Sequence, residues 1–174
     1  MTAITNQLLS RNAAYAKTHQ PRPPLPTLNT IVLSCVDARI DPAHILGLAP
    51  GEAVVLRNAG ARVTDAVEQD IGLLIAMASA ALGRPAAPEI VLIHHTQCGV
   101  EMLCSHDTVG KLSRATQIPS TVLEARAIAD HEQSLRTDLA RLAASPHVPA
   151  GITVSAMRYD QTYGRLDLLF TEAL

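Results

Sequence analysis

The sequence predicts an α/β fold with a central, mainly parallel β-sheet flanked by helices. Short continuous apolar runs, typical of strands covered on both faces, alternate with longer segments in which apolar residues recur every three to four positions. Strands that alternate with helices need right-handed crossovers, and these produce a mainly parallel sheet. A chain of 174 residues fits one such domain and is long enough to bury a sizeable core.

The first part of the chain is expected to lie outside this core. Residues 3–19 are predicted to form a weakly amphipathic helix, and QPRPPLP (20–26) must be extended because each proline restricts the residue before it. Residues 1–27 are therefore interpreted as an N-terminal arm with a proline-rich linker, and residues 28–174 as the α/β core. The arm has too little apolar surface to fold alone, so we expect it to pack on the core or on a second subunit.

Five strands are expected in the core. Three are the apolar runs TIVLSC, EAVVLRN and EIVLIHH, at 30–35, 52–58 and 89–95. Two more are predicted at 151–160 and 164–170, joined by a turn around Tyr163 and Gly164. These last two should form an antiparallel hairpin, so the sheet ends in an antiparallel strand.

Two helices are expected between the strands. One begins after Thr64 as its N-cap and continues to about Leu82, with Gly83 as its C-terminal stop. The other covers roughly 120–144, before Pro146. The stretch GKLSRATQ (110–117) is interpreted as a solvated loop.

Composition excludes several classes of function. A net charge of −2 without polybasic runs argues against nucleic-acid binding. The most apolar long segment, residues 71–83, is too short to cross a bilayer, and the N-terminus lacks the pattern of a signal peptide. We therefore expect a cytoplasmic protein without a membrane partner, in which the three cysteines stay reduced. An odd cysteine count also argues against a disulfide framework and leaves metal binding or plain burial.

Candidate functional residues follow three of the predicted strands. In an open parallel sheet, ligands bind beyond the carboxyl ends of the strands. The residues delivered to that edge are Cys35, Asp37 and Arg39 after the first strand, Asn58 after the second, and His95 and Cys98 after the third.

Two cysteines and one histidine of this set suit a Zn²⁺ ion. Cys35, His95 and Cys98 supply two sulfurs and one nitrogen, and three protein ligands leave a tetrahedral ion one open position, as in catalytic sites. The fourth position would hold water or a side chain that can exchange with water, for which Asp37 is the nearest candidate. Taken alone, Cys35 would be interpreted as a buried packing residue, and a single His-x-x-Cys is common by chance.

Asp37 and Arg39 allow two interpretations. They can form a surface ion pair of little value. Beside a metal-bound hydroxide, Arg39 would instead keep the Asp37 carboxylate ionised and oriented to accept a hydrogen bond from that hydroxide. Because two thiolates cancel the charge of Zn²⁺, the bound water should be less acidic than at a three-histidine site, and activity should rise on the alkaline side.

Three motifs together resemble the β-class carbonic anhydrases, and in particular the small, compact members of bacteria and archaea. They are CVDAR (35–39), RNAGARVTD (57–65) and HHTQCG (94–99), and the likeness extends over about residues 28–170. Gln97 stands where relatives often have aspartate, and the chain lacks the tryptophan of the regulatory bicarbonate site found in some members.

The resemblance implies reversible hydration of CO₂ to bicarbonate and a proton, at one Zn²⁺ per subunit. Cys35, His95 and Cys98 would be the ligands, Asp37 and Arg39 the catalytic dyad, and Asn58 and Gly60 part of the substrate pocket, Gly60 through its backbone N–H. It also implies a homodimer or a dimer-based oligomer in which the N-terminal arm wraps around the partner.

Two rival functions remain open. The protein could hydrolyse carbonyl sulfide or carbon disulfide on the same scaffold, or it could be a catalytically inactive zinc-binding homologue, although the latter would not need the dyad.

The other histidine and cysteine residues are interpreted without a catalytic or metal-binding role. His94 and Cys104 are interpreted as buried packing residues, His106 and Asp107 as loop residues beside the site, and His131 as a helix residue with no site to join.

Overall fold

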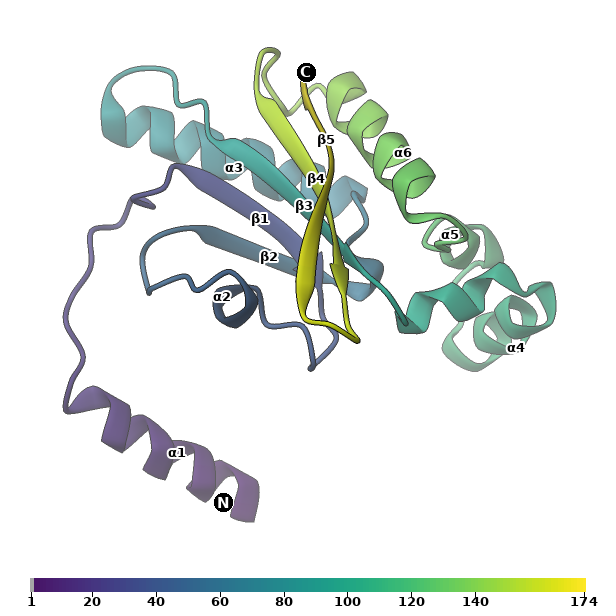
Figure 1. Ribbon diagram of the computed structural model, residues 1–174, viewed down its shortest axis with the longest axis horizontal. Coiled ribbons are helices and arrows are strands. Elements are labelled where there is room, and N and C mark those ends of the chain that lie inside the picture. Colours follow the sequence, from purple (N-terminus) through teal and green to yellow (C-terminus); the bar gives the residue numbers. More distant parts are fainter. Residues whose placement is uncertain (1) are drawn as a thin grey trace.

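The computed structural model describes residues 2–174, which form one five-stranded sheet, shown with its flanking helices in Figure 1. The strands follow the order β2-β1-β3-β4-β5, with β5 antiparallel to β4 and the other pairs parallel. Their bounds are β1 Thr30–Cys35, β2 Val54–Asn58, β3 Glu89–His95, β4 Thr153–Asp160 and β5 Arg165–Ala173. The α/β class, the parallel sheet and the C-terminal antiparallel strand are confirmed.

The strand predictions agree with the structure within a few residues. TIVLSC and EIVLIHH match β1 and β3 at both ends, because each is a run of apolar residues that the sheet buries. The final hairpin turns at Gly164, whose φ of 67° lies in the left-handed region that glycine adopts without strain. There the Gly164 N–H donates to the Asp160 carbonyl at 2.8 Å and closes the turn.

Six α-helices and two short 3₁₀ segments complete the part of the chain that is described. They are α1 Ala3–Ala16, α2 Pro42–Ile45, η1 Ala59–Ala61, α3 Asp65–Leu82, η2 Gly99–Cys104, α4 His106–Thr116, α5 Ser120–Glu124 and α6 His131–Ala144. Within residues 2–174, no helix combines the length and the apolar character that crossing a membrane requires.

The predicted limits of α3 are confirmed in detail. The Thr64 hydroxyl accepts the Val67 N–H, and Gly83 ends the helix in the left-handed conformation. From this helix Ile71 and Ile75, with Leu135 and Leu142 of α6, pack on the face of the sheet that carries Leu33. The main core therefore lies between the sheet and these two helices.

The prediction of one helix over 120–144 is wrong. Helix α5 ends at Glu124, and α6 starts only at His131, with the Asp130 carboxylate accepting the Gln133 N–H at 2.7 Å. The intervening chain leaves the helical path so that Ile128 is buried, while the Ala127 carbonyl accepts a hydrogen bond from Arg62 at 2.8 Å. A tertiary contact thus outweighs the helical propensity of this segment.

The stretch 110–117 is also different from the prediction. Residues 110–116 belong to α4, which is capped by the Ser105 hydroxyl and buries Val109, and Gln117 ends the helix. The sequence does contain the pattern of a helix start here. Ser105 is followed by Asp107 in the first turn, and apolar residues stand three positions apart at 109 and 112.

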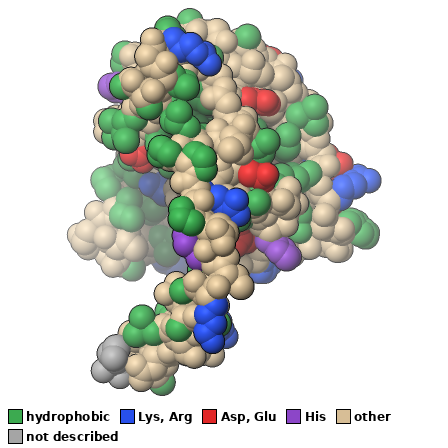
Figure 2. Space-filling view, turned by 90° about the vertical axis from the view of Figure 1, so that its left-hand side faces the viewer, with side chains coloured by type: hydrophobic (Ala, Val, Ile, Leu, Met, Phe, Trp, Pro, Cys, Tyr) green, Lys and Arg blue, Asp and Glu red, His purple; other side chains and the backbone are tan. Residues whose placement is uncertain are grey.

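Helix α1 extends away from the rest of the protein (Figures 1 and 2). None of its residues is buried, and its apolar side chains Ile4, Leu8 and Leu9 are 69%, 58% and 54% exposed. The extended proline-rich segment after it carries no helix or strand. The N-terminal helix of the predicted fold is therefore confirmed, and the division into arm, linker and core stays a prediction.

Gly72, in the middle of α3, is expected to resist a substitution that usually stabilises helices. A Cβ placed on it would lie 2.6 Å from the His147 carbonyl oxygen, so Gly72→Ala should lower the free energy of unfolding by about 1–3 kcal/mol because α3 must move. Gly110→Ala in α4 is the matched control, since its Cβ would meet only the Arg114 side chain at 3.5 Å. That change should stabilise by about 0.5–1 kcal/mol. Urea unfolding measures both, and equal effects would contradict the expectation.

Candidate metal site and catalytic residues

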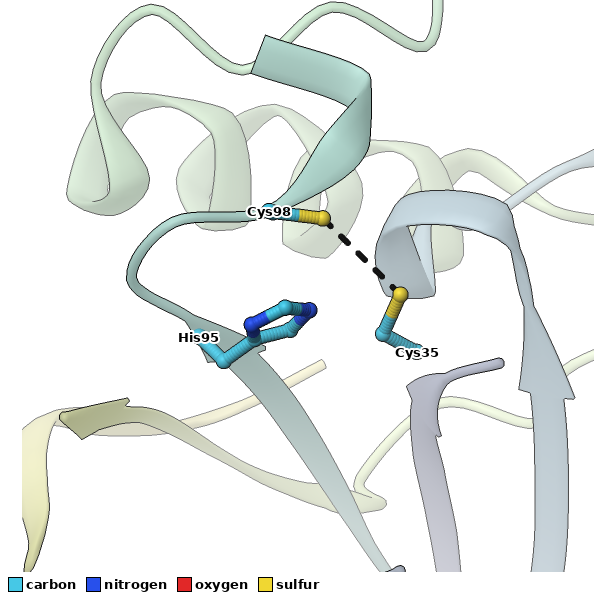
Figure 3. Close-up of side chains that lie close together, drawn as sticks. All are labelled: Cys35, His95 and Cys98. Atoms are coloured by element: carbon cyan, nitrogen blue, oxygen red, sulfur yellow. Dashed lines mark hydrogen bonds between the residues drawn. The ribbon is translucent and has the colours of Figure 1, made fainter. Parts of the chain in front are cut away.

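Three potential metal ligands meet at the carboxyl edge of the sheet. Cys35 is the last residue of β1 and His95 the last residue of β3, and Cys98 follows in the turn before η2. One donor atom from each lies within 4.8 Å of the others, the two sulfurs are 3.8 Å apart, and all three residues are buried (Figure 3). Among residues 2–174 this is the group of histidine, cysteine and acidic side chains that could hold a metal ion.

The histidine of this group offers one nitrogen without a partner. Its Nδ1 lies 3.0 Å from the Thr96 carbonyl oxygen, which can only accept, so Nδ1 carries the proton. The other nitrogen, Nε2, is buried and has no hydrogen-bond partner. A buried nitrogen with a free lone pair beside two sulfurs is the donor set that a zinc ion requires. The residues therefore fit the metal.

The two thiols influence each other strongly. A hydrogen bond from the Cys98 thiol lowers the pKa of Cys35 to about 4, although burial opposes this shift. The same hydrogen bond, together with burial, raises the pKa of Cys98 above its ordinary value. A divalent cation binds thiolates, so binding both sulfurs would release the protons that they carry.

Asp37 and Arg39 form a two-pronged ion pair beside the sulfurs. Arg39 Nε donates to Asp37 Oδ1 at 3.0 Å, Arg39 Nη2 donates to Oδ2 at 2.7 Å, and the Arg39 N–H adds a third hydrogen bond to Oδ1 at 2.9 Å. The hydrogen bonds from the Arg39 side chain hold the pKa of Asp37 well below its usual range. Its carboxylate is therefore ionised at neutral and mildly acid pH.

Arg57, the first residue of the RNAGARVTD motif, supports the loop that carries Asp37 and Arg39. From β2 its Nε donates to the Cys35 carbonyl at 2.9 Å, and its Nη2 donates to the carbonyls of Asp37 and Ile40 at 2.8 and 2.5 Å. One guanidinium thus holds three backbone oxygens of the CVDARI stretch. The sequence places this arginine on a strand that neighbours the strand of Cys35. Only the parallel register, in which Ser34 pairs with Arg57, shows that its side chain can contact the carbonyls after Cys35.

Asn58 and Gly60, predicted to line a substrate pocket, build the turn after β2. The Asn58 amide donates to the Arg62 carbonyl at 2.7 Å, and its oxygen accepts the Arg62 N–H at 2.9 Å. Gly60 has a φ of 86°, and a Cβ on it would lie 2.9 Å from Val100 Cγ2, so only glycine fits. Its N–H donates to Cys35 Sγ at 3.4 Å. The Gly60 N–H is therefore directed at the sulfur, and the place of both residues in a substrate pocket stays a prediction.

His94 is buried, as expected, but its surroundings are polar. Its Nε2 lies 3.8 Å from Asp138 Oδ2, and neither ring nitrogen has a hydrogen-bond partner. Burial, with the neighbouring His131 and the nearby charge of Arg62, lowers the pKa of His94 to about 3. His94 is therefore neutral at physiological pH.

His131, the first residue of α6, lies near the turn that carries the ligands without belonging to the cluster. Its Nε2 lies 3.7 Å from the Glu101 carboxylate, which accepts the Cys98 N–H at 3.0 Å, and its ring meets that of His94 edge to face. Glu101 was recognisable in the sequence, because an acidic residue three positions after the residue that starts a helical turn commonly caps that turn. His131 was not, since its contact depends on the break between α5 and α6.

The structure contradicts the expectations that Cys104 is buried and that His106 lies in a loop. Cys104 is exposed and not buried, at the edge of an open depression of about 560 Å³ that Gln97 and His131 also line. His106 and Asp107 form the first turn of α4 instead of a loop, where Asp107 pairs with Lys111 at 2.5 Å. Neither contacts the ligand cluster through a hydrogen bond or an ion pair.

Comparison with known proteins agrees with this arrangement. The family model described as carbonic anhydrase matches residues 30–155. Beta-carbonic anhydrase 1 of Mycobacterium tuberculosis is 31% identical over 165 residues, which are 94% of this chain and 96% of that protein. The carbon disulfide hydrolase of Saccharolobus solfataricus is 36% identical over 69 residues, only 40% of this chain and 30% of the relative.

A solved structure extends the likeness to the whole chain. The carbonic anhydrase of Streptococcus mutans superposes with a TM-score of 0.77 at 29% identity, covering 98% of this chain and 99% of that one. The sheet order, the strand-end cysteine and histidine, and these matches point to one conclusion. The chain belongs to the carbonic anhydrase family and is an enzyme of its β class.

Proposed function

We propose that this protein is a zinc-dependent carbonic anhydrase that catalyses the reversible hydration of CO₂ to bicarbonate and a proton. The observation that carries the proposal is the buried Cys35–His95–Cys98 cluster, whose unpartnered His95 Nε2 and two sulfurs converge within 4.8 Å. When bound, Zn²⁺ would supply the Lewis acid that lowers the pKa of water and makes it a better nucleophile. The three free cysteines also suit the cytoplasm, where thiols stay reduced.

Asp37 and Arg39 are proposed as the catalytic dyad. Because Asp37 stays ionised, its carboxylate can accept a hydrogen bond from the attacking water and leave a lone pair of that oxygen directed at CO₂. Arg39 occupies both carboxylate oxygens and so fixes the orientation of the group. Gly60 and Asn58 are proposed to shape the wall of the same pocket through the turn they build.

Replacing the dyad carboxylate should remove most of the activity. We expect Asp37→Asn to lower kcat/KM for CO₂ hydration by about 100-fold, because an amide cannot act as a charged acceptor. Asp70→Asn changes an exposed carboxylate on α3, so it is the control and should have no effect.

The pH profile of the wild type is a second prediction. Its kcat/KM should rise on the alkaline side. Because the pKa of Asp37 is held low, this rise should come from the metal-activated water and not from Asp37. Stopped-flow assays over a range of pH measure both.

Three outcomes of that assay would contradict the proposal. A pH profile that is flat from mildly acid upward would exclude a titrating water. An inactive, zinc-loaded wild type would favour a homologue that binds metal without catalysis. A strong preference for carbonyl sulfide or carbon disulfide in parallel assays would favour the second candidate function, which the partial match to the carbon disulfide hydrolase supports.

Metal analysis tests the ligand set separately. The purified protein should contain one Zn²⁺ per subunit, and Cys98→Ser should weaken zinc binding by more than about 100-fold, since even residues that only support a ligand contribute 10- to 100-fold. Cys104→Ser is the matched control, because this exposed thiol lies outside the cluster and should leave the zinc content unchanged. Equal zinc content in the two variants would exclude the proposed ligands.

We further propose a homodimer in which the arm of each subunit packs on its partner. A helix with no buried residue is not stable alone in water, and α1 exposes Ile4, Leu8 and Leu9. On the face shown in Figure 2 the body also carries many apolar side chains. In α3, Leu73 and Met77 are 59% and 61% exposed. Apolar surface of this extent on both parts favours burial against a second copy.

The arm can be tested without touching the site. The double change Leu8→Asp and Leu9→Asp should convert the dimer into a monomer in sedimentation velocity experiments, because two charges cannot be buried in an apolar contact. Asn12→Asp places a charge on the same helix at a polar position and should preserve the dimer. A monomeric wild type, or a leucine variant that sediments like the wild type, would exclude this mode of assembly.

A further inference from the structure

Gln97, between the two ligands of the HHTQCG turn, has an unusual backbone conformation. Its φ is 58°, in the left-handed region that side-chain-bearing residues seldom adopt. Such conformations persist only where the surrounding structure enforces them, and they are frequent at functional sites. Neither the proposed zinc ligands nor the contacts within the dyad explain the left-handed conformation of Gln97.

The left-handed backbone directs the Gln97 carbonyl to Arg39. Arg39 Nη2 donates to this oxygen at 3.1 Å, and the same nitrogen donates to Asp37 Oδ2 at 2.7 Å. The Arg39 side chain is 47% exposed, so solvent competes with its ion pair, and the Gln97 carbonyl restricts the guanidinium further. The carbonyl thus joins the dyad to the turn that carries His95 and Cys98.

The β4–β5 hairpin in turn holds the Gln97 segment. The Gln97 side-chain Nε2 donates to Thr162 Oγ1 at 3.3 Å. Its neighbour Thr96 donates its N–H to the Tyr159 carbonyl at 3.0 Å and accepts the Gln161 N–H at its hydroxyl at 2.9 Å. Three hydrogen bonds from one hairpin therefore maintain the conformation from which the carbonyl reaches Arg39.

We propose that Gln97 is a positioning residue for the Asp37–Arg39 dyad, acting through its backbone carbonyl on Arg39 and through its side chain on Thr162. The inference rests on the proposed function, because the dyad has a catalytic role only there. The hydrogen bond that Gln97 makes to the dyad is the one to Arg39, and its contribution is to limit the orientations of the guanidinium that orients the carboxylate.

Substitutions that differ in their tolerance of the left-handed conformation test this proposal. In Gln97→Val a β-branched side chain disfavours that conformation, so the carbonyl should leave Arg39, and kcat should fall about tenfold with little change in KM. Gln97→Gly keeps the conformation accessible and should stay within about threefold of the wild type. Thr162→Val removes only the side-chain contact and should lower kcat by about threefold.

The chain offers a matched control in Gln117. It is also a glutamine in the left-handed conformation, with a φ of 61°, but it ends α4, away from the dyad. Gln117→Val should destabilise the fold in the same way as Gln97→Val while leaving kcat unchanged. Zinc content is measured in every variant, and if Gln97→Val loses zinc, the test passes to Thr162→Val, whose side chain is not part of the cluster.

Two measurements distinguish positioning from a general structural effect. The first is a double-mutant cycle, in which Gln97→Val should have no further effect on kcat once Arg39 is changed to alanine. The second is the ¹⁵N NMR signal of the Arg39 Nε–H group, which should be sharp in the wild type and in Gln97→Gly, and broadened or lost in Gln97→Val. This signal does not depend on turnover.

The outcomes separate the two proposals. A zinc-loaded wild type that does not hydrate CO₂ would overturn the proposed function, while the NMR signal would still report whether Gln97 orders Arg39. Full activity with an unchanged Arg39 signal in zinc-loaded Gln97→Val or Thr162→Val would overturn the positioning role. The positioning role would also be overturned if Gln97→Val lowered kcat by the same factor in the wild type and in the Arg39→Ala variant.

Discussion

The parallel pairing of β1 with its two neighbours is the constraint on which the site depends. In this register Cys35 lies opposite Asn58 of β2, and Ser34 lies opposite Ile93 of β3. Because successive side chains of a strand point to opposite faces, a shift of one residue would turn Cys35 away from His95 and Cys98. Packing keeps the register, since Leu33 and Cys35 lie in the main core and Val32 in a second cluster, and the same shift would exchange side chains between two packed cores.

A buried ion pair connects this edge to the helices that cover the sheet. Arg62, at the end of the Gly60 turn, donates to both carboxylate oxygens of Asp138 on α6 at 2.8 and 3.2 Å, and both side chains are less than 10% exposed. Separating such a pair leaves an uncompensated buried charge, which costs about 3–5 kcal/mol. The pair therefore holds α6, the turn beside Cys35 and, through the Ala127 carbonyl, the break before α6 in one arrangement.

Most of the fold, and the ligand cluster, could be predicted from the sequence for identifiable reasons. The strands are continuous apolar runs, and the cap of α3 by Thr64 depends on residues a few positions apart. The ligands follow from the rule that parallel strands deliver their last residues to one edge. The break at 125–130 and the roles of Arg57, Gln97 and His131 depend instead on contacts between residues distant in sequence. No local pattern encodes a guanidinium that reaches three carbonyls of another loop, or a left-handed glutamine held by a hairpin.

The spacing of the two cysteines has a consequence for the unfolded chain. Cys35 and Cys98 are 63 positions apart, yet their sulfurs lie 3.8 Å from each other. A metal ion bound to both would close a loop of that length and act as a reversible cross-link between β1 and the turn after β3. A permanent cross-link over such a loop removes unfolded-state entropy equivalent to about 4 kcal/mol at 25 °C. The ion would then influence the folding equilibrium as a chain constraint, in addition to any part it has in chemistry.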